Sequence, residues 1–287
     1  MNAMTFKQCT QLVALLLGLA ALPLFAQDKA KKLDALVSQY VANGQFNGTV
    51  LVGEKGQVVF KKGYGMANME WKIPNTPDTK FRLGSITKQF TAMLIMQLVE
   101  QGKLKLDGKI TDYLPDYPKA TGDKITIHHL LTHTSGIPSY TGFPKFFEND
   151  SRDPYTPEAF TKKFSDLPLE FEPGTKFSYN NSGYFLLGVI LEKVTGKSYA
   201  TVLKESITTP LKLGDTGYDL AGPLIAKRAA GYEKRNGSYV NAPYLDMSLP
   251  YAAGSLYSTV EDLYRWDQAL YSDMLISAQA KQTMFTP

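Results

Sequence analysis

Cysteine is almost absent from this sequence of 287 residues, since it occurs only at Cys9. That residue lies ahead of the apolar stretch 12–26, whereas a cysteine that carries a lipid would directly follow such a stretch. We therefore do not expect a lipoprotein. If residues 1–26 are removed, the mature protein has no thiol, which excludes disulfides, cysteine nucleophiles and thiolate metal sites together.

Long apolar runs and clusters of basic residues are lacking as well. The apolar stretch 12–26 follows Lys7, ends in a small residue and is short for a membrane span. We interpret 1–26 as a secretory signal peptide and expect a periplasmic or secreted protein. The alternative is an uncleaved segment, which would then be the only contact with a membrane. The net charge of +4 is small and spread along the chain, so we expect no nucleic-acid partner.

Histidine is scarce, with only three residues, all between positions 128 and 133. His129 and His133 have the spacing of zinc ligands on a helix. However, Leu130 stands where the metalloprotease motif has its catalytic glutamate, so the segment has no base. We expect neither a metal nor another cofactor.

The residues that are present indicate a mixed α/β (α+β) fold. Val-rich segments at 48–53 and 57–62, joined through a glycine, predict a β-hairpin. Hydrophobic periodicity predicts helices at 29–45, 85–102, 126–133, 182–196, 259–271 and 277–285. Residues 134–156 are rich in turn residues and aromatics, and we expect them to form the rim of a cleft. We expect one domain over 27–287, with sheet-associated parts at about 29–80 and 240–287 and a mostly helical region at about 85–230.

The stretch FRLGSITKQF (81–90) places Lys88 three residues after Ser85, where a capping box would have Glu or Gln. Residues three apart lie on one face of a helix, and the apolar run that follows indicates burial. Burial and a helix N-terminus both lower the pKa of a lysine, and a neutral Lys88 could take the proton of the Ser85 hydroxyl. Backbone N–H groups at the helix start could stabilise the negative charge that develops. The ordinary alternative is a serine cap beside a solvated lysine.

A second motif is FSYNNSGYFLLGVI (177–190), in which Tyr179 and Asn181 are two residues apart. In an extended segment both side chains point the same way. A phenol can pass on a proton, and an amide can both donate and accept hydrogen bonds. Alternatively, Tyr179 serves packing, and Asn181 or Ser182 caps the helix that follows.

Together the two motifs resemble those of the penicillin-recognising serine hydrolases, closest to the branch of class C β-lactamases, DD-peptidases and esterases. Similar segments are LLTHTSGIP (130–138), EPGTKFSYNNSGY (172–184) and AAGSLYSTVEDLYRW (252–266). The resemblance implies a β-lactamase/transpeptidase-like fold, with an antiparallel sheet flanked by helices. It implies that Ser85 is the acylated nucleophile and that Lys88 assists its deprotonation. Tyr179 would shuttle protons, and Asn181 would bind the substrate amide or position Lys88.

The resemblance has one departure, because the family's third motif, Lys-Thr-Gly or His-x-Gly, does not occur after Tyr179. We expect a truncated form of a longer protein that lacks the C-terminal sheet strands and is weak or inactive as it stands. The expected function is a serine hydrolase that acts through an acyl-enzyme on β-lactams, D-amino-acid peptides or small esters. The alternative is a non-catalytic module that binds penicillin or cell-wall fragments. The sequence leaves open the substrate class, the division of the base role between Lys88 and Tyr179, and the oligomeric state.

Overall fold

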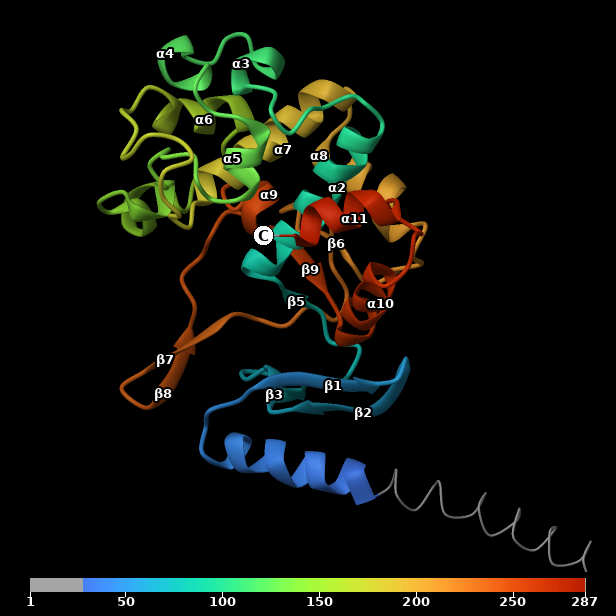
Figure 1. Ribbon diagram of the computed structural model, residues 1–287. Coiled ribbons are helices and arrows are strands. Elements are labelled where there is room, and N and C mark those ends of the chain that lie inside the picture. Colours follow the sequence, from blue (N-terminus) through green and yellow to red (C-terminus); the bar gives the residue numbers. More distant parts are fainter. Residues whose placement is uncertain (1–27, 287) are drawn as a thin grey trace, which may run out of the picture. The chain divides into compact units, whose positions relative to one another are not determined.

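The structure is a computed structural model that describes residues 28–286 (Figure 1). The signal peptide predicted at 1–26, and Cys9 with it, lies outside the described residues. The chain divides into two compact units, Met1–Thr79 (unit 1) and Lys80–Pro287 (unit 2). Within 28–286 no helix combines the length and the apolar character needed to cross a bilayer.

Unit 1 contains a helix over residues 28–42 and the predicted hairpin, formed by β1 (Gly48–Glu54) and β2 (Gln57–Tyr64). Both central residues of its turn, Lys55 and Gly56, have positive φ, which matches the right-handed twist of paired strands. The hairpin prediction is therefore confirmed. Two further strands, β3 (Met66–Asn68) and β4 (Ile73–Pro74), form a second antiparallel pair.

Unit 2 contains a three-stranded antiparallel sheet in the order β5-β9-β6. Its strands are β5 (Phe81–Arg82), β9 (Leu256–Ser258) and β6 (Gly217–Tyr218). These strands have only two or three residues each, and they carry none of the alternation that would reveal them in the sequence. The sheet matters for function because β5 leads directly into the segment that carries Ser85.

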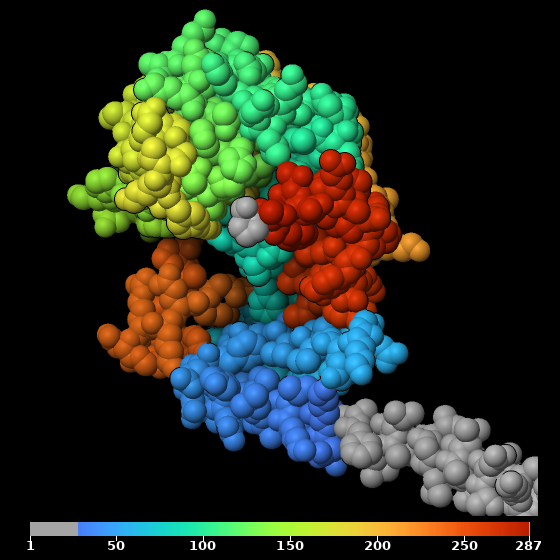
Figure 2. Space-filling view, viewed as in Figure 1, coloured from blue at the N-terminus to red at the C-terminus, as the bar shows by residue number. Residues whose placement is uncertain are grey.

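A second hairpin in unit 2 consists of β7 (Tyr232–Arg235) and β8 (Ser238–Asn241), joined at Asn236 and Gly237. Every residue of β8 is exposed. The space-filling view shows this hairpin, in orange, projecting from the helices of its unit (Figure 2).

The remainder of unit 2 is mostly helical. Its α-helices are α2 (Thr87–Glu100), α3 (Ile110–Tyr113), α4 (Lys119–Gly122), α5 (Ile127–Leu131), α6 (Pro157–Ser165), α7 (Asn181–Thr195), α8 (Tyr199–Leu203), α9 (Tyr251–Gly254), α10 (Val260–Leu270) and α11 (Ala278–Phe285). Single turns of tighter or wider helix are η1 (Gly84–Ile86), η2 (Tyr140–Gly142), η3 (Phe146–Asp150) and η4 (Lys204–Thr208).

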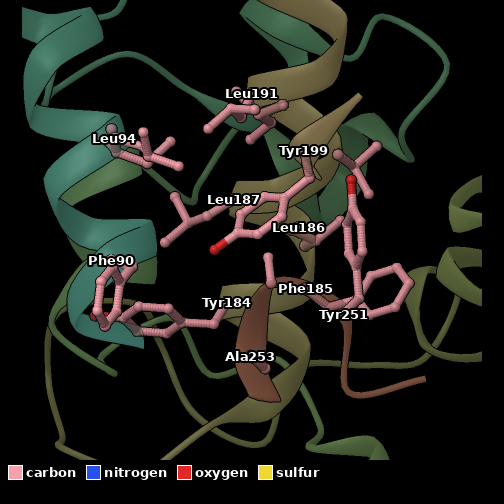
Figure 3. Close-up of a cluster of buried hydrophobic side chains, with 14 of the residues drawn as sticks. Phe90, Leu94, Tyr184, Phe185, Leu186, Leu187, Leu191, Tyr199, Tyr251 and Ala253 are labelled. Atoms are coloured by element: carbon pink, nitrogen blue, oxygen red, sulfur yellow. The ribbon is translucent and has the colours of Figure 1, made fainter. Parts of the chain in front are cut away.

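Helix α7 is the centre of the hydrophobic core. Its residues are buried without a break from Ser182 to Leu191, as expected for a helix that is apolar on all sides. Figure 3 shows Leu94 of α2 beside Leu187 and Leu191 of α7, with α9 below them. The core therefore fixes α2, α7 and α9 against one another, and each of these three elements contributes a group to the site described next.

Helix α9 lies unusually close to α7 at Gly188. A Cβ atom at that position would overlap the ring of Tyr251 and would lie 2.5 Å from Cβ of Ala252. Tyr251 has a positive φ of 41°, a backbone conformation that is costly for a residue with a side chain. The close approach therefore depends on the missing side chain of Gly188.

Candidate active site

Ser85 and Lys88 meet at the beginning of α2. Ser85 is exposed in η1, and Nζ of Lys88 lies 3.2 Å from its Oγ. The position before α2 is Ile86, and no side chain caps this helix. Lys88 is only 6% exposed. The structure thus differs from the ordinary alternative, because Ser85 is not the helix cap and Lys88 is not solvated.

The amine of Lys88 has three neutral hydrogen-bond acceptors. Besides Ser85 Oγ they are Oδ1 of Asn181 and the backbone carbonyl of Ala253, each at 2.9 Å. Burial lowers the pKa of Lys88 below its ordinary value, and the nearby phenol of Tyr179 opposes this shift in part. Neutral acceptors compensate the cost of burying a charge less than a carboxylate would, so they do not cancel the lowering of the Lys88 pKa.

Tyr179 reaches the same serine from the segment that precedes α7. Its hydroxyl donates to Oγ of Ser85 at 2.7 Å, and its ring centroid lies 4.8 Å from Nζ of Lys88. Tyr179 is 47% exposed, in contrast to the buried lysine. The Ser85 oxygen therefore contacts a buried amine, that of Lys88, and an exposed phenol, that of Tyr179.

Asn181 is the first residue of α7, and the helix cap is Asn180, whose Oδ1 accepts from Gly183 N at 2.7 Å. The prediction of Asn181 or Ser182 as the cap was therefore wrong by one residue. This shift leaves the Asn181 side chain available. Its Oδ1 accepts from Lys88, and its Nδ2 donates to Oγ1 of Thr141 at 2.9 Å, which fixes the orientation of the amide.

A cavity of about 240 Å³ opens beside Ser85. The stretch expected to form a cleft rim contributes Thr141 and Phe147 to its lining, and Leu245 and Met247 stand in the same wall. The candidate site thus has an exposed serine hydroxyl next to a largely apolar recess.

Three groups that contact the candidate residues could not be predicted from the sequence. Ala253 acts through its backbone carbonyl, which leaves no mark on the residue type, and Thr141 lies 40 residues before its partner Asn181. His133 stacks on Tyr179, with ring centroids 4.6 Å apart. The repeated Ser/Thr content of 139–141 was the available signal for Thr141.

The histidines with zinc-ligand spacing use their rings to bind the backbone. Nδ1 of His129 accepts from Thr126 N at 3.3 Å, and Nδ1 of His133 accepts from Asn180 N at 3.0 Å. In the described part of the chain, no three His, Cys, Asp or Glu side chains are placed to hold a metal ion.

Comparison with known proteins places this geometry in a family. Residues 33–287 match the family model described as Beta-lactamase. Penicillin-binding protein 4* of Bacillus subtilis is 36% identical over 91% of this chain and 60% of its own length. The teichoic acid D-alanine hydrolase of Staphylococcus aureus is 32% identical over 82% of this chain and 56% of its own length. The chain thus spans about 60% or less of these two curated relatives.

Solved structures show the same relationship. A penicillin-binding protein from Bacillus halodurans superposes with a TM-score of 0.79 at 32% identity, over 87% of this chain and 77% of that one. A D-amino acid amidase from Ochrobactrum anthropi gives a TM-score of 0.71 at 30% identity, over 85% and 70%. These matches confirm the predicted β-lactamase/transpeptidase-like fold. The chain belongs to the β-lactamase family, the group of serine hydrolases that includes the penicillin-binding proteins.

Proposed function

We propose that this chain is a serine hydrolase that works through an acyl-enzyme on Ser85. The observation that carries the proposal is the contact of one exposed serine oxygen with both Lys88 and Tyr179, at 3.2 and 2.7 Å. A serine hydroxyl is a weak nucleophile unless a base lies within hydrogen-bond reach. Both neighbours meet that requirement.

In the first step, Oγ of Ser85 forms a bond to the carbonyl carbon of the substrate, and its proton passes to the neutral amine of Lys88. Tyr179 gives its own proton to the leaving amine or alkoxide and recovers one from Lys88. Its exposure supports this division, because the Tyr179 phenol is open to solvent and can release a proton to a departing group, whereas the Lys88 amine is buried. In the second step, a water molecule gives up a proton and its oxygen bonds to the acyl carbon. The bond from that carbon to Ser85 Oγ then breaks, the acid product leaves, and Oγ takes up the proton that the water lost.

The negative charge on the substrate oxygen needs a donor that is in place before the reaction. We propose the backbone N–H of Ser85, because the first N–H groups of a helix have no partner within the helix. It lies at the start of the helical segment formed by η1 and α2.

For Asn181 we propose the role of positioning Lys88 over that of binding the substrate. Both ends of its amide are already engaged, the oxygen by Lys88 and the nitrogen by Thr141. With its oxygen fixed on Nζ, the amide keeps the lysine directed at Ser85.

The proposed substrates are β-lactams, D-amino-acid peptides or small esters. The names of the relatives support this range, since they include penicillin-binding proteins, a D-alanine hydrolase and a D-amino acid amidase. The apolar wall beside Ser85, with Phe147, Leu245 and Met247, favours acyl groups that carry an apolar substituent.

The test is covalent labelling of the full chain with a fluorophosphonate and, separately, with a labelled penicillin. We expect one adduct by intact mass, located on Ser85 by peptide mapping and absent from Ser85→Ala. Ser238→Ala, on the exposed strand β8, is the matched control and keeps the adduct. Labelling that survives Ser85→Ala refutes the assignment. Penicillin that binds reversibly without an adduct would instead favour the non-catalytic binding module.

A further inference from the structure

His133 follows α5 in the segment that faces the chain around Tyr179. Its backbone has a positive φ of 59°, which is uncommon for a residue other than glycine and is found most often for Asn, Asp and His. The side chain is partly buried. Two hydrogen bonds to the neighbouring chain hold His133 in this backbone conformation.

Both polar contacts go to the backbone on either side of Tyr179. The carbonyl of His133 accepts from Ser178 N at 2.8 Å, and its Nδ1 accepts from Asn180 N at 3.0 Å. The two N–H groups belong to the residues directly before and after Tyr179. His133 therefore holds the main chain on both sides of this tyrosine.

The imidazole ring adds a third contact, with the Tyr179 side chain itself. Its centroid lies 4.6 Å from the Tyr179 ring and 5.0 Å from the Tyr184 ring, both at 33°. An Nδ1 atom that accepts a hydrogen bond carries no proton, so the neutral ring must be protonated at Nε2. Burial lowers the pKa of His133 to about 4, which keeps this acceptor available near neutral pH.

We infer that His133 is the positioning residue for Tyr179, and that its Nδ1 acceptor holds the phenol oxygen on Ser85. This inference rests on the proposed function. His133 does not contact the substrate in this proposal. It acts through the main chain at Asn180 and through the ring of Tyr179.

Three substitutions separate the acceptor from the ring. His133→Asn keeps an acceptor oxygen one bond from Cγ and tolerates positive φ, but it loses the ring. His133→Phe keeps a ring but leaves Asn180 N without its partner. His133→Ala loses both. We expect Ser85 acylation by a fluorophosphonate to fall tenfold or more in the Phe and Ala variants, with substrate affinity little changed, and to stay within about threefold in the Asn variant.

The matched control is His129→Phe. His129 also accepts a backbone hydrogen bond through Nδ1, from Thr126 N, and makes no contact with Tyr179. This variant loses the same kind of bond and should be acylated at the normal rate. Equal loss in His129→Phe and His133→Phe would show a general effect on folding and overturn the inference.

A second readout does not depend on activity. In the full chain labelled with ¹⁵N and ¹³C, NMR should show His133 protonated at Nε2 alone. An NOE should join the Tyr179 ring to the Ser85 β-protons, should disappear in His133→Phe and should persist in His133→Asn. If the wild type is not acylated at all, the proposed function fails. The NMR signals then test the role of His133 by themselves. Protonation at Nδ1, or an unchanged NOE in His133→Phe, overturns it.

Discussion

The contact between α7 and α9 makes Gly188→Ala an informative substitution. In an exposed helix this change would stabilise the protein by about 1 kcal/mol, because alanine has the higher helix propensity. Here the new Cβ would overlap the Tyr251 ring and lie 2.5 Å from the Ala252 Cβ, and both residues are buried. Overpacking of this kind costs roughly 1–3 kcal/mol, and two rigid neighbours favour the upper part of that range. The expected net loss of unfolding free energy is about 1–2 kcal/mol.

The same substitution should also affect the chemistry. Relief of the overlap moves α9, and α9 carries the Ala253 carbonyl that accepts from Lys88 at 2.9 Å. A displacement of several tenths of an ångström weakens that hydrogen bond, and we expect Ser85 acylation to slow by about tenfold.

Urea unfolding followed by tryptophan fluorescence and far-UV circular dichroism measures the first effect, and the single-turnover labelling rate measures the second. The control is Gly214→Ala, since a Cβ at that position meets no atom within 4 Å. It should change the unfolding free energy by no more than about 0.5 kcal/mol. A Gly188→Ala protein that is more stable than the wild type by about 1 kcal/mol would refute the close approach of α9.

Three further predictions concern Lys88, His133 and the N-terminus. Lys88→Met should slow Ser85 acylation by about 10²–10⁴-fold in single-turnover labelling, and a loss below tenfold would remove Lys88 as the base. His133, which faces Lys88, Tyr179 and Tyr184, has a pKa lowered from 6.5 to about 4. Its contribution to stability is complete above pH 6.5 and is lost as the pH falls toward 4, so urea unfolding should show a smaller acid loss for His133→Asn than for the wild type. Equal acid loss in both would contradict this assignment. Secreted protein should begin at Gln27 on N-terminal sequencing, and a start at Met1 or Met4 would exclude the signal peptide.

Local sequence signals were sufficient for several parts of the fold and of the site. The β1–β2 hairpin was predicted because Val-rich segments flank a turn with glycine, and Gly196 was predicted correctly as the end of α7. The proximity of Ser85 and Lys88 also follows from helical spacing alone. Their association with Tyr179 and Asn181, 91 or more residues away, came only from resemblance to a family.

Other parts depend on tertiary contacts that the sequence does not display. Two adjacent asparagines can each cap a helix, and the choice of Asn180 over Asn181 is tied to the bond between Asn181 and Lys88. The bond from Lys88 to Ala253 spans 165 residues and ends on a backbone atom. Helical periodicity also placed one continuous helix from Ser85, whereas the serine lies in a separate 3₁₀ turn before α2.

The projecting hairpin β7–β8 offers a place to cut the chain without disturbing the candidate active site. Its tip at Asn236 and Gly237 is exposed, and tips of this kind accept inserted peptides and protease cuts. A cut at this tip would leave β5 and β6 on one fragment and β9 on the other. The fragments would still share one sheet, because β9 lies between β5 and β6. A nicked protein would therefore stay assembled as two interlocked fragments, and a reporter spliced into the tip would leave the serine, its lysine and the Ala253 carbonyl in register.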